Sequence, residues 1–188
     1  MKPKNKDSES AIWKILSSQV RYEYQPFLRV DKQRVQLPDG RVIGDYHQVK
    51  MPEYCLICPL TSERKLVTLH GYRHGVRRVT SFLPGGLIDS DETPVESAKR
   101  ELLEKTGYMS GKWMSLGSYT PHSNYGCGRV HIFKAMDVSQ ITNPDSGDLE
   151  NMDIRIVDSK TIKKWIESGN IDSLSSVAAI TLGLGDIF

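Results

Sequence analysis

The alternation of hydrophobic and polar residues predicts several strands, one central helix, further strands and two closing helices. Alternating segments flank Leu37-Pro38-Asp39-Gly40, a turn sequence that predicts a β-hairpin. Residues 10–20 fit either a short strand or a helical turn. Other strands are expected at 54–60, 65–72, 113–119, 129–137 and 153–157, and the segment 78–83 leads into the glycine pair. This order indicates an α+β fold in which a mixed sheet lies between helices, as in an α-β-α sandwich, with an added N-terminal β-hairpin.

The central helix has well-specified ends. Thr93 suits the N-cap, Pro94 the first helical position and Glu96 the third, which completes a capping box, and Gly107 ends the helix. The apolar side of the helix, which is expected to dock on a sheet, comprises Val95, Ala98, Leu102 and, at its edge, Leu103.

Two more helices are expected near the end of the chain. Ser159 is the candidate N-cap of the first, which ends at Gly169. The second spans about 173–182 and ends at Gly183 or Gly185.

Composition is typical of a soluble globular protein. The 188 residues, 38% hydrophobic and 26% charged, suffice for one ordinary domain with a small appended element. The net charge is +2 without a basic stripe, which argues against nucleic-acid binding. No apolar run approaches the ~20 residues of a membrane span, and the polar start MKPKNKDSES predicts no secretory signal. An odd number of cysteines, three, favours a cytoplasmic location.

Cys55 and Cys58 form a C-x-x-C motif inside the apolar run YCLICPL. A strand directs these two side chains to opposite faces, so buried structural thiols are expected. The alternative is a zinc site, which needs two further ligands, and His122, Cys127 and His131 supply only a scattered set.

Two carboxylates on the central helix are the candidates for chemistry. Glu101 and Glu104 are three residues apart and share one helix face, where they repel unless a cation or a proton lies between them. Mg²⁺ prefers such oxygen ligands. The alternative is a solvated face with two ordinary ion pairs, Arg100–Glu104 and Glu101–Lys105. The preceding Gly-Gly loop lets backbone approach a ligand closely, which favours the metal site.

The spacing of glycines and charges around this helix extends over more than twenty residues. Its order is Gly86, five residues, Glu92, seven residues, Arg100-Glu101-Leu102, one residue, Glu104, Lys105, one residue, Gly107 and Tyr108. This pattern resembles the Nudix box, with two departures: the family has a second glutamate where Lys105 stands, and an aliphatic residue where Tyr108 stands.

The resemblance covers most of the chain and is closest to the ADP-ribose pyrophosphatase branch. The similar segments are Trp13-Lys14-Ile15-Leu16, the hairpin, Tyr72-Arg73, Leu83-Pro84-Gly85-Gly86, Pro121 and the helices from Trp165 to Ala179. It implies an N-terminal strand and hairpin element at 1–50, which can mediate homodimerisation, and a Nudix domain at 51–188.

The activity implied by the resemblance is Mg²⁺-dependent (or Mn²⁺-dependent) hydrolysis of the diphosphate of ADP-ribose or a related nucleoside diphosphate sugar. The products are a nucleoside monophosphate and a sugar phosphate. The metal ligands it implies are Glu101, Glu104 and the carbonyl of Gly85, with Arg100 beside them. Glu150 is the candidate general base, and its alternative is a solvated loop acid.

The resemblance also implies the substrate contacts. Trp13 and Tyr46 are candidates to hold the base between them, or else are packing residues. Arg73 is a candidate to contact phosphate or to brace a box carboxylate, with an exposed strand-end arginine as the alternative. Gly86 lets the loop approach substrate, and Glu92 is either a more distant metal ligand or a brace for the loop.

Lys105 marks the clearest departure from the family pattern. A protonated lysine cannot ligate Mg²⁺, but at i+4 from Glu101 it can form an ion pair. We expect its ammonium to replace one cation partly, leaving fewer metals and a weakened or redirected activity. The loop at 119–128 also lacks the glutamate of many relatives, and His122 is a weak substitute. The alternative function is a catalytically impaired, Nudix-like nucleotide-binding or regulatory domain.

Overall fold

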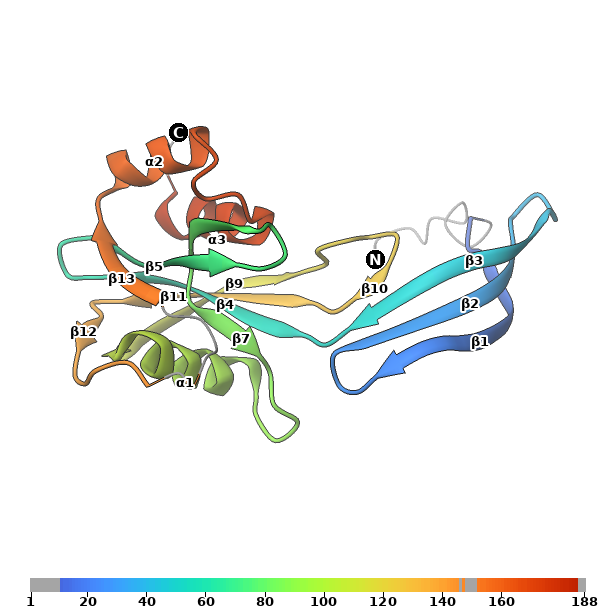
Figure 1. Ribbon diagram of the computed structural model, residues 1–188, viewed down its shortest axis with the longest axis horizontal. Helices are drawn as coiled ribbons and strands as arrows, with labels where there is room; N and C mark the ends of the chain where they lie inside the picture. Colours follow the sequence, from blue (N-terminus) through green and yellow to red (C-terminus); the bar gives the residue numbers. More distant parts are fainter. Residues whose placement is uncertain (1–10, 146, 148–151, 186–188) are drawn as a thin grey trace, which may run out of the picture. The chain divides into compact units, whose positions relative to one another are not determined.

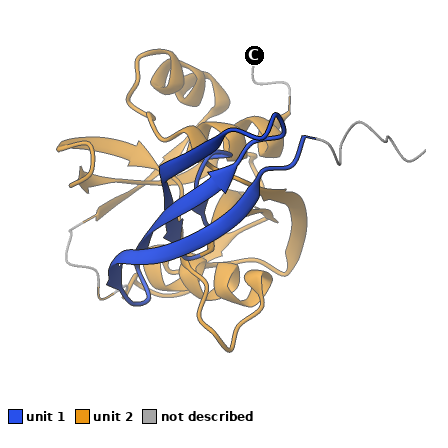
Figure 2. Ribbon diagram, turned by 90° about the vertical axis from the view of Figure 1, so that its right-hand side faces the viewer, with its two compact units in different colours: residues 1–52, 122–128 blue, residues 53–121, 129–188 orange. Residues whose placement is uncertain are grey.

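The computed structural model describes residues 11–145, 147 and 152–185. The chain divides into two compact units, coloured separately in Figure 2. Unit 1 consists of Met1–Pro52 and His122–Gly128, and unit 2 of Glu53–Pro121 and Arg129–Phe188. The short segment 122–128 therefore belongs with the N-terminal residues, although it comes from the middle of the chain.

Unit 1 is a four-stranded sheet in the order β1-β2-β3-β10. The strands are β1 (Lys14–Tyr24), β2 (Leu28–Gln36), β3 (Val42–Met51) and β10 (Gly126–Cys127). The first three are antiparallel neighbours, and β10 runs parallel to β3. The expected hairpin connects β2 and β3, with Gly40 at a φ of 88°, a conformation that favours glycine. Most of residues 10–20 are strand rather than helical turn.

Unit 2 is built on a seven-stranded mixed sheet. Its main order is β13-β5-β4-β11-β9, with β6 paired to β5 and β7 paired to β4. The strands are β4 (Tyr54–Leu60), β5 (Leu66–Arg73), β6 (Arg78–Phe82), β7 (Gly85–Leu87), β9 (Lys112–Tyr119), β11 (Val130–Met136) and β13 (Met152–Val157). Only β4 and β11 pair in parallel among these strands. A separate small sheet joins β8 (Tyr108–Met109) to β12 (Ser139–Gln140).

Helices cover both faces of the larger sheet (Figure 1). Helix α1 (Pro94–Thr106) lies on one face, and α2 (Ser159–Glu167) and α3 (Leu174–Leu184) lie on the other. Two buried clusters fill the two layers. The α1 cluster includes Cys55, Ile57, Val67, Ala98, Leu102 and Tyr108. The other cluster includes Leu56, Cys58, Ile132, Ile162, Ala179 and Ile180. The predicted α+β fold, with a mixed sheet between helices, is therefore confirmed.

The two cysteines of the C-x-x-C motif lie in opposite clusters. Cys55 belongs to the α1 layer and Cys58 to the α3 layer, as the alternation of strand β4 predicts. Both thiols are free and buried, and burial raises the pKa of Cys58 to about 12. They are structural thiols, which supports the simpler of the two interpretations.

Both ends of helix α1 follow the local rules of capping. The Thr93 hydroxyl accepts a hydrogen bond from the Glu96 amide (3.4 Å), and the Glu96 carboxylate accepts one from the Thr93 amide (2.8 Å). Gly107 ends the helix at a φ of 71° and donates its N–H to the carbonyl of Leu103 (2.7 Å). The predicted capping box and glycine stop are both confirmed.

The N-cap predicted for α2 is wrong by one residue. Asp158, not Ser159, is the cap, and its carboxylate accepts a hydrogen bond from the Thr161 amide (2.7 Å). That hydrogen bond holds the pKa of the Asp158 carboxyl below its ordinary value. Aspartate and serine cap helices about equally well, so local preference cannot choose between neighbours. In the next helix, α3, the C-cap is Gly185 rather than Gly183.

Gly183 is required for the packing of α3 against strand β4. A Cβ at this position would overlap the Cys58 sulfur and lie 3.6 Å from Cδ1 of Leu116. We expect Gly183→Ala to lower the free energy of unfolding by about 1–3 kcal/mol, because overpacking outweighs the helix propensity gained. Urea unfolding measures this, and Cys58→Ala in the same chain should recover part of the loss. An unchanged denaturation midpoint in Gly183→Ala would contradict the packing.

Candidate active site

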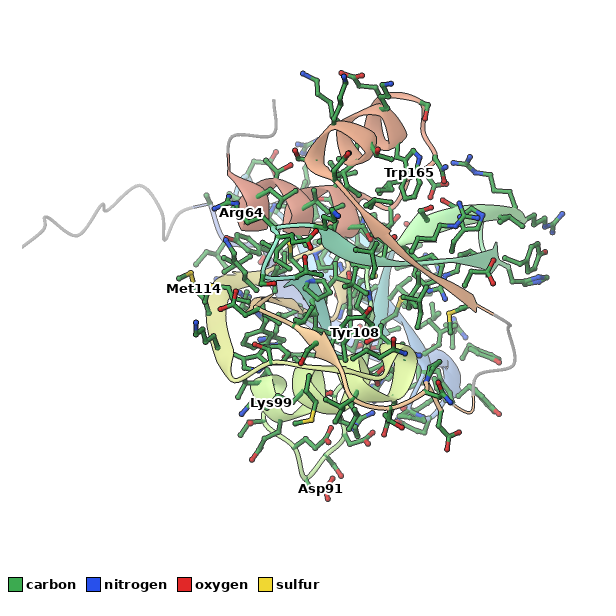
Figure 3. All side chains as sticks on the ribbon, turned by 90° about the vertical axis from the view of Figure 1, so that its left-hand side faces the viewer. Arg64, Asp91, Lys99, Tyr108, Met114 and Trp165 are labelled. Atoms are coloured by element: carbon green, nitrogen blue, oxygen red, sulfur yellow. The ribbon has the colours of Figure 1, made fainter. Side chains whose placement is uncertain are left out.

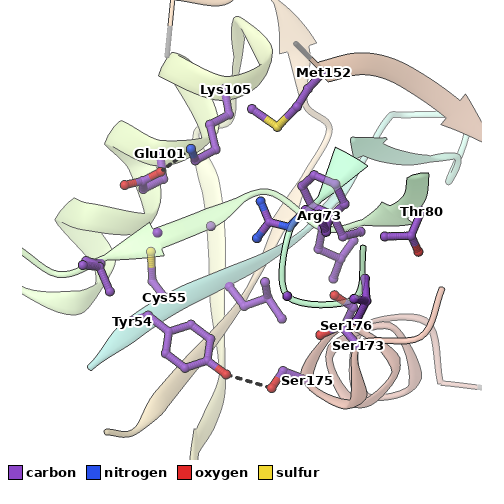
Figure 4. Close-up of a pocket in the computed structure, with 18 of the residues that line it drawn as sticks. Tyr54, Cys55, Arg73, Thr80, Glu101, Lys105, Met152, Ser173, Ser175 and Ser176 are labelled. Atoms are coloured by element: carbon purple, nitrogen blue, oxygen red, sulfur yellow. Dashed lines mark hydrogen bonds and ion pairs between the residues drawn. The ribbon is translucent and has the colours of Figure 1, made fainter. Parts of the chain in front are cut away.

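Unit 2 contains an open cavity of about 950 Å³ between the two helical layers (Figure 4). Helix α1 contributes Glu101 and Lys105 to one side of it, and the first turn of α3 contributes Ser176 to another. Arg73, at the end of β5, lines the cavity together with Gly86 of β7. Residues of several strands and of helices α1 and α3 thus line one cavity.

The glycine pair allows two close approaches to strand β7. A Cβ at Gly85 would overlap the backbone carbonyl of Cys55 on the paired strand β4. A Cβ at Gly86 would overlap the carboxylate of Glu101. Strand β7 can therefore lie against both β4 and the Glu101 side chain only because these residues carry no side chain.

Arg100 connects the acidic groups of the box. Its Nε and Nη2 donate to the two oxygens of Glu92, each at 2.8 Å, and its Nη1 donates to Glu101 (2.9 Å) and Glu104 (3.1 Å). These hydrogen bonds, donated by Arg100, lower the pKa of the Glu92 carboxyl and raise the pKa of the Arg100 guanidinium. Through these two hydrogen bonds Glu92 ties the loop before α1 to Arg100.

Glu101 is the most buried of these carboxylates, at 7% exposed. Burial raises the pKa of its carboxyl, and the nearby charges of Lys105 and Arg100 oppose that rise. The Lys105 ammonium lies 3.7 Å from the second oxygen of Glu101. Both ion pairs of the alternative interpretation are present, Arg100–Glu104 and Glu101–Lys105, but the second is largely buried and is not a solvated surface pair.

The acidic groups suit one hard divalent cation. One oxygen each of Glu101 and Glu104 accepts a hydrogen bond from the Nη1 atom of Arg100, so the two carboxylates face a common cationic group. Two carboxylates leave coordination positions for water and substrate phosphate, as Mg²⁺ sites usually do. No group of three or more potential ligands from His, Cys, Asp and Glu occurs in the part of the chain that the structure describes.

The other predicted residues are placed as follows. Arg73 is exposed at the end of β5, where its guanidinium lies 4.4 Å from the ring centre of Phe82 and it lines the cavity. In unit 1, Trp13 and Tyr46 are in edge-to-face contact, with ring centres 5.5 Å apart. Glu150 lies outside the described residues.

Tyr108, where the family pattern has an aliphatic residue, has a packing role. It is 7% exposed and belongs to the cluster that joins α1 to the sheet. Figure 3 labels it near α1, well apart from Trp165 of α2, which packs against the cluster of the opposite layer. Tyr108 therefore fills a buried packing position between α1 and the sheet.

The first turn of α3 was not among the predicted site residues. The hydroxyl of Ser175 is 2.8 Å from that of Tyr54, on β4, and Ser173 and Ser176 also line the cavity (Figure 4). The only sequence signal was the cluster of serines in Ser173-Leu174-Ser175-Ser176, which by itself indicates a helix start. Its proximity to Tyr54 arises from the tertiary fold.

Comparison with known proteins identifies the class to which this fold and acidic site belong, the Nudix hydrolases. The chain belongs to the Nudix family, because the NUDIX domain model matches residues 52–172. A second model, the nucleoside diphosphate sugar hydrolase N-terminal domain, matches residues 13–49. Nudix hydrolases generally use a divalent metal ion.

Individual relatives support the predicted branch. The ADP-ribose pyrophosphatase of Bacillus subtilis (strain 168) is 26% identical over 150 residues, which cover 78% of this chain and 79% of that protein. The CMP-5'-(N-acetyl-N-hydroxy-3-aminopropyl)phosphonate hydrolase of Streptomyces rubellomurinus (strain ATCC 31215) is 31% identical over 122 residues, 63% of this chain and 57% of that protein. A solved ADP compounds hydrolase has the same fold, with a TM-score of 0.78, 20% identity and coverage of 90% and 91%. The resemblance to ADP-ribose pyrophosphatases is confirmed. No helix in the described residues is long and apolar enough to cross a membrane.

Proposed function

We propose that this Nudix hydrolase cleaves the diphosphate of ADP-ribose or a related nucleoside diphosphate sugar, in a reaction that depends on Mg²⁺ or Mn²⁺. The products would be a nucleoside monophosphate and a sugar phosphate. The observation that carries the proposal is the buried Glu101 carboxylate, held against Gly86 at the wall of the cavity and joined to Glu104 through Arg100.

Each residue of the site has a distinct part in this proposal. Glu101 and Glu104, with the carbonyl of Gly85, hold the metal, which when bound polarises the diphosphate. Arg100 orients both carboxylates and, through Glu92, holds the loop that precedes α1. Arg73 places a positive charge in the cavity, where it stabilises charge on phosphate oxygens.

General base catalysis is assigned to Glu150, which would accept a proton from the attacking water. The assignment rests on the position of Glu150 in the sequence, two residues before strand β13. The Met152 end of this strand lines the cavity.

The test of the proposed function is hydrolysis of ADP-ribose and of a panel of nucleoside diphosphate sugars in the presence of Mg²⁺ or Mn²⁺. Chromatography measures the AMP or other nucleoside monophosphate that is released. Turnover that needs the metal and favours members of this panel is the expected result. A second candidate function is nucleotide binding without hydrolysis, which the ion pairs of Glu101 with Arg100 and Lys105 favour. Calorimetric binding of ADP-ribose without any release of AMP would establish that candidate instead.

Lys105 is assigned the role of a built-in cation that replaces part of the metal charge. Its ammonium already lies 3.7 Å from Glu101. We expect Lys105→Glu to bind more Mn²⁺ per chain, and at least about tenfold more tightly, because a repelling charge becomes a ligand. Electron paramagnetic resonance of free Mn²⁺ measures the stoichiometry without reference to turnover. Lys99→Glu, an exposed change on the same helix, is the control; equal Mn²⁺ binding in the two variants would count against this role.

A homodimer formed through unit 1 accounts for the exposed apolar residues of that unit. All eleven residues of β1 are exposed, including Ile15 at 63%, Val20 at 43% and Tyr22 at 55%. Exposed apolar surface of this extent is typical of an interface. Within the dimer, Trp13 and Tyr46 are assigned to stack with the base of the substrate. The substrate of this site is a small molecule. We place the protein in the cytoplasm, where its cysteine thiols stay reduced.

Sedimentation velocity provides the test of the dimer. We expect a dimer for the unmodified chain and a monomer for Val20→Lys, because a buried lysine without a partner opposes association. Arg21→Lys, which keeps the charge of the neighbouring exposed position, is the matched control. A monomeric unmodified chain at micromolar concentration would contradict the proposal.

A further inference from the structure

The first turn of α3 presents unused hydrogen-bond donors to the cavity. The first intrahelical bond runs from the Val177 amide to the Ser173 carbonyl (3.0 Å), so the amides of Leu174, Ser175 and Ser176 have no acceptor within the helix. Ser173 occupies the N-cap, but its side chain makes no capping hydrogen bond. This helix start is therefore left open where the other two helices are closed by Thr93 and Asp158.

The residue that precedes the cap does not close the helix either. Asp172 turns its carboxylate toward strand β6, where it accepts from Arg78 (2.5 and 3.2 Å) and from the Thr80 hydroxyl (3.4 Å). Arg78 also donates to the carbonyl of Gly169 (2.7 Å). The negative charge of Asp172 is thus compensated by Arg78 and does not satisfy the α3 amides.

Ser176 provides an independent indication that something binds here. The residue is 2% exposed, lines the cavity, and makes no hydrogen bond through its hydroxyl to any other described residue. Figure 4 shows it beside Ser173 on the cavity side of α3. Asp31 Oδ2 is the one buried side-chain oxygen or nitrogen without a hydrogen bond among the described residues, so the Ser176 hydroxyl still opens to the cavity, where a ligand or water can supply its partner.

The charges around this turn favour an anion. A helix N-terminus carries a partial positive charge, and its free amides are a common binding site for phosphate. Arg73 lines the same cavity, and its β5 backbone pairs with Arg78 of β6. The hydroxyls of Ser173 and Ser176 add two donors of the kind that phosphate oxygens accept.

We infer that the N-terminal turn of α3 is a subsite for a phosphate group, separate from the carboxylates of α1. Its ligand is either a phosphate on the sugar of the substrate, beyond the diphosphate, or free inorganic phosphate. The first source deepens the proposed function and rests on it, since it makes phosphorylated nucleoside diphosphate sugars the favoured substrate class. The second makes the subsite a point at which phosphate inhibits turnover.

The decisive variant is Ser173→Asp. Aspartate is a good N-cap and favours an acidic first turn, so this change is expected to keep or raise the melting temperature. The new carboxylate would also accept hydrogen bonds from the open amides and repel an anion. Titration of ¹⁵N-labelled protein with inorganic phosphate, without divalent metal, should shift the amide signals of Ser175 and Ser176, and Ser173→Asp should weaken that binding at least about tenfold, or about 1.4 kcal/mol.

Two further variants make the result specific. Ser176→Ala removes only the unpartnered hydroxyl and should also weaken phosphate binding. Thr181→Ala, on the exposed side of the same helix, should leave it unchanged. Phosphate that binds Ser173→Asp as well as the unmodified chain, or that shifts no amide of this turn, would overturn the inference.

Kinetics separate the two sources of phosphate. If the substrate carries it, kcat/KM is higher for ADP-ribose with a further phosphate on its second ribose than for ADP-ribose, and Ser173→Asp removes that preference. If free phosphate is the ligand, it inhibits both substrates equally, and Ser173→Asp relieves the inhibition. The titration does not depend on turnover, so shifted amides in a chain that hydrolyses nothing would support the subsite and refute the proposed function.

Discussion

Replacing Glu101 by glutamine is expected to lower kcat/KM for hydrolysis of ADP-ribose roughly 10³-fold. A metal-centred stabilisation of the transition state is worth several kcal/mol, and each 1.36 kcal/mol is about tenfold in rate. Glutamine keeps the size of the side chain but removes its negative charge. Because Glu101 is buried, a carboxylate on the protein surface cannot take its place. Steady-state AMP release at saturating Mg²⁺ measures the effect.

Glu167→Gln is the matched control for this experiment. It makes the same chemical change at an exposed residue at the end of α2, and activity should stay within twofold of that of the unmodified chain. Folding is checked by urea unfolding of both variants. If Glu101→Gln folds normally and still cleaves ADP-ribose at a comparable rate, the acidic helix is not the catalytic site.

Gly86→Ala should have the second largest effect, about 10²-fold in kcat/KM. The added methyl group would overlap the Glu101 carboxylate, so this side chain must move away from the cavity wall. Displacement of a catalytic group by about 1 Å can cost on the order of 10²-fold. Gly111→Ala is the control, because a Cβ at Gly111 meets no atom within 4 Å.

A double variant shows whether Gly86 acts through Glu101. If the methyl group acts only by displacing this carboxylate, Gly86→Ala should add little to the loss caused by Glu101→Gln, since the two changes then act on one interaction. Additive losses in kcat/KM would show instead that Gly86 serves the site independently, for instance by contact with substrate. Normal activity of the single variant would contradict the close approach.

Much of the site could be predicted because its elements are close in sequence. The capping box of Thr93 and Glu96 and the stop at Gly107 depend on hydrogen bonds between residues at most four apart, which the backbone geometry of a helix determines. The opposite placement of Cys55 and Cys58 follows from strand alternation in the same way. The ion pairs of Arg100 with Glu104 and of Glu101 with Lys105 follow from helical spacing.

Contacts between distant segments could not be read from the sequence. The burial of Glu101 depends on strand β7 pairing with β4, and Ser175 meets Tyr54 although 121 residues separate them. The open first turn of α3 depends on Asp172 pairing with Arg78 rather than with its own helix.

The sequence by itself determined most of the longer strands, both ends of α1 and the order of charged groups on α1, because these depend on local backbone geometry and side-chain periodicity. Only the tertiary structure decided which carboxylate is buried, which arginine joins the acids to the preceding loop, and which helix start faces the cavity. Those outcomes depend on packing between layers. The contacts that stabilise this packing join residues far apart in the sequence, so the order of residues along the chain does not reveal them.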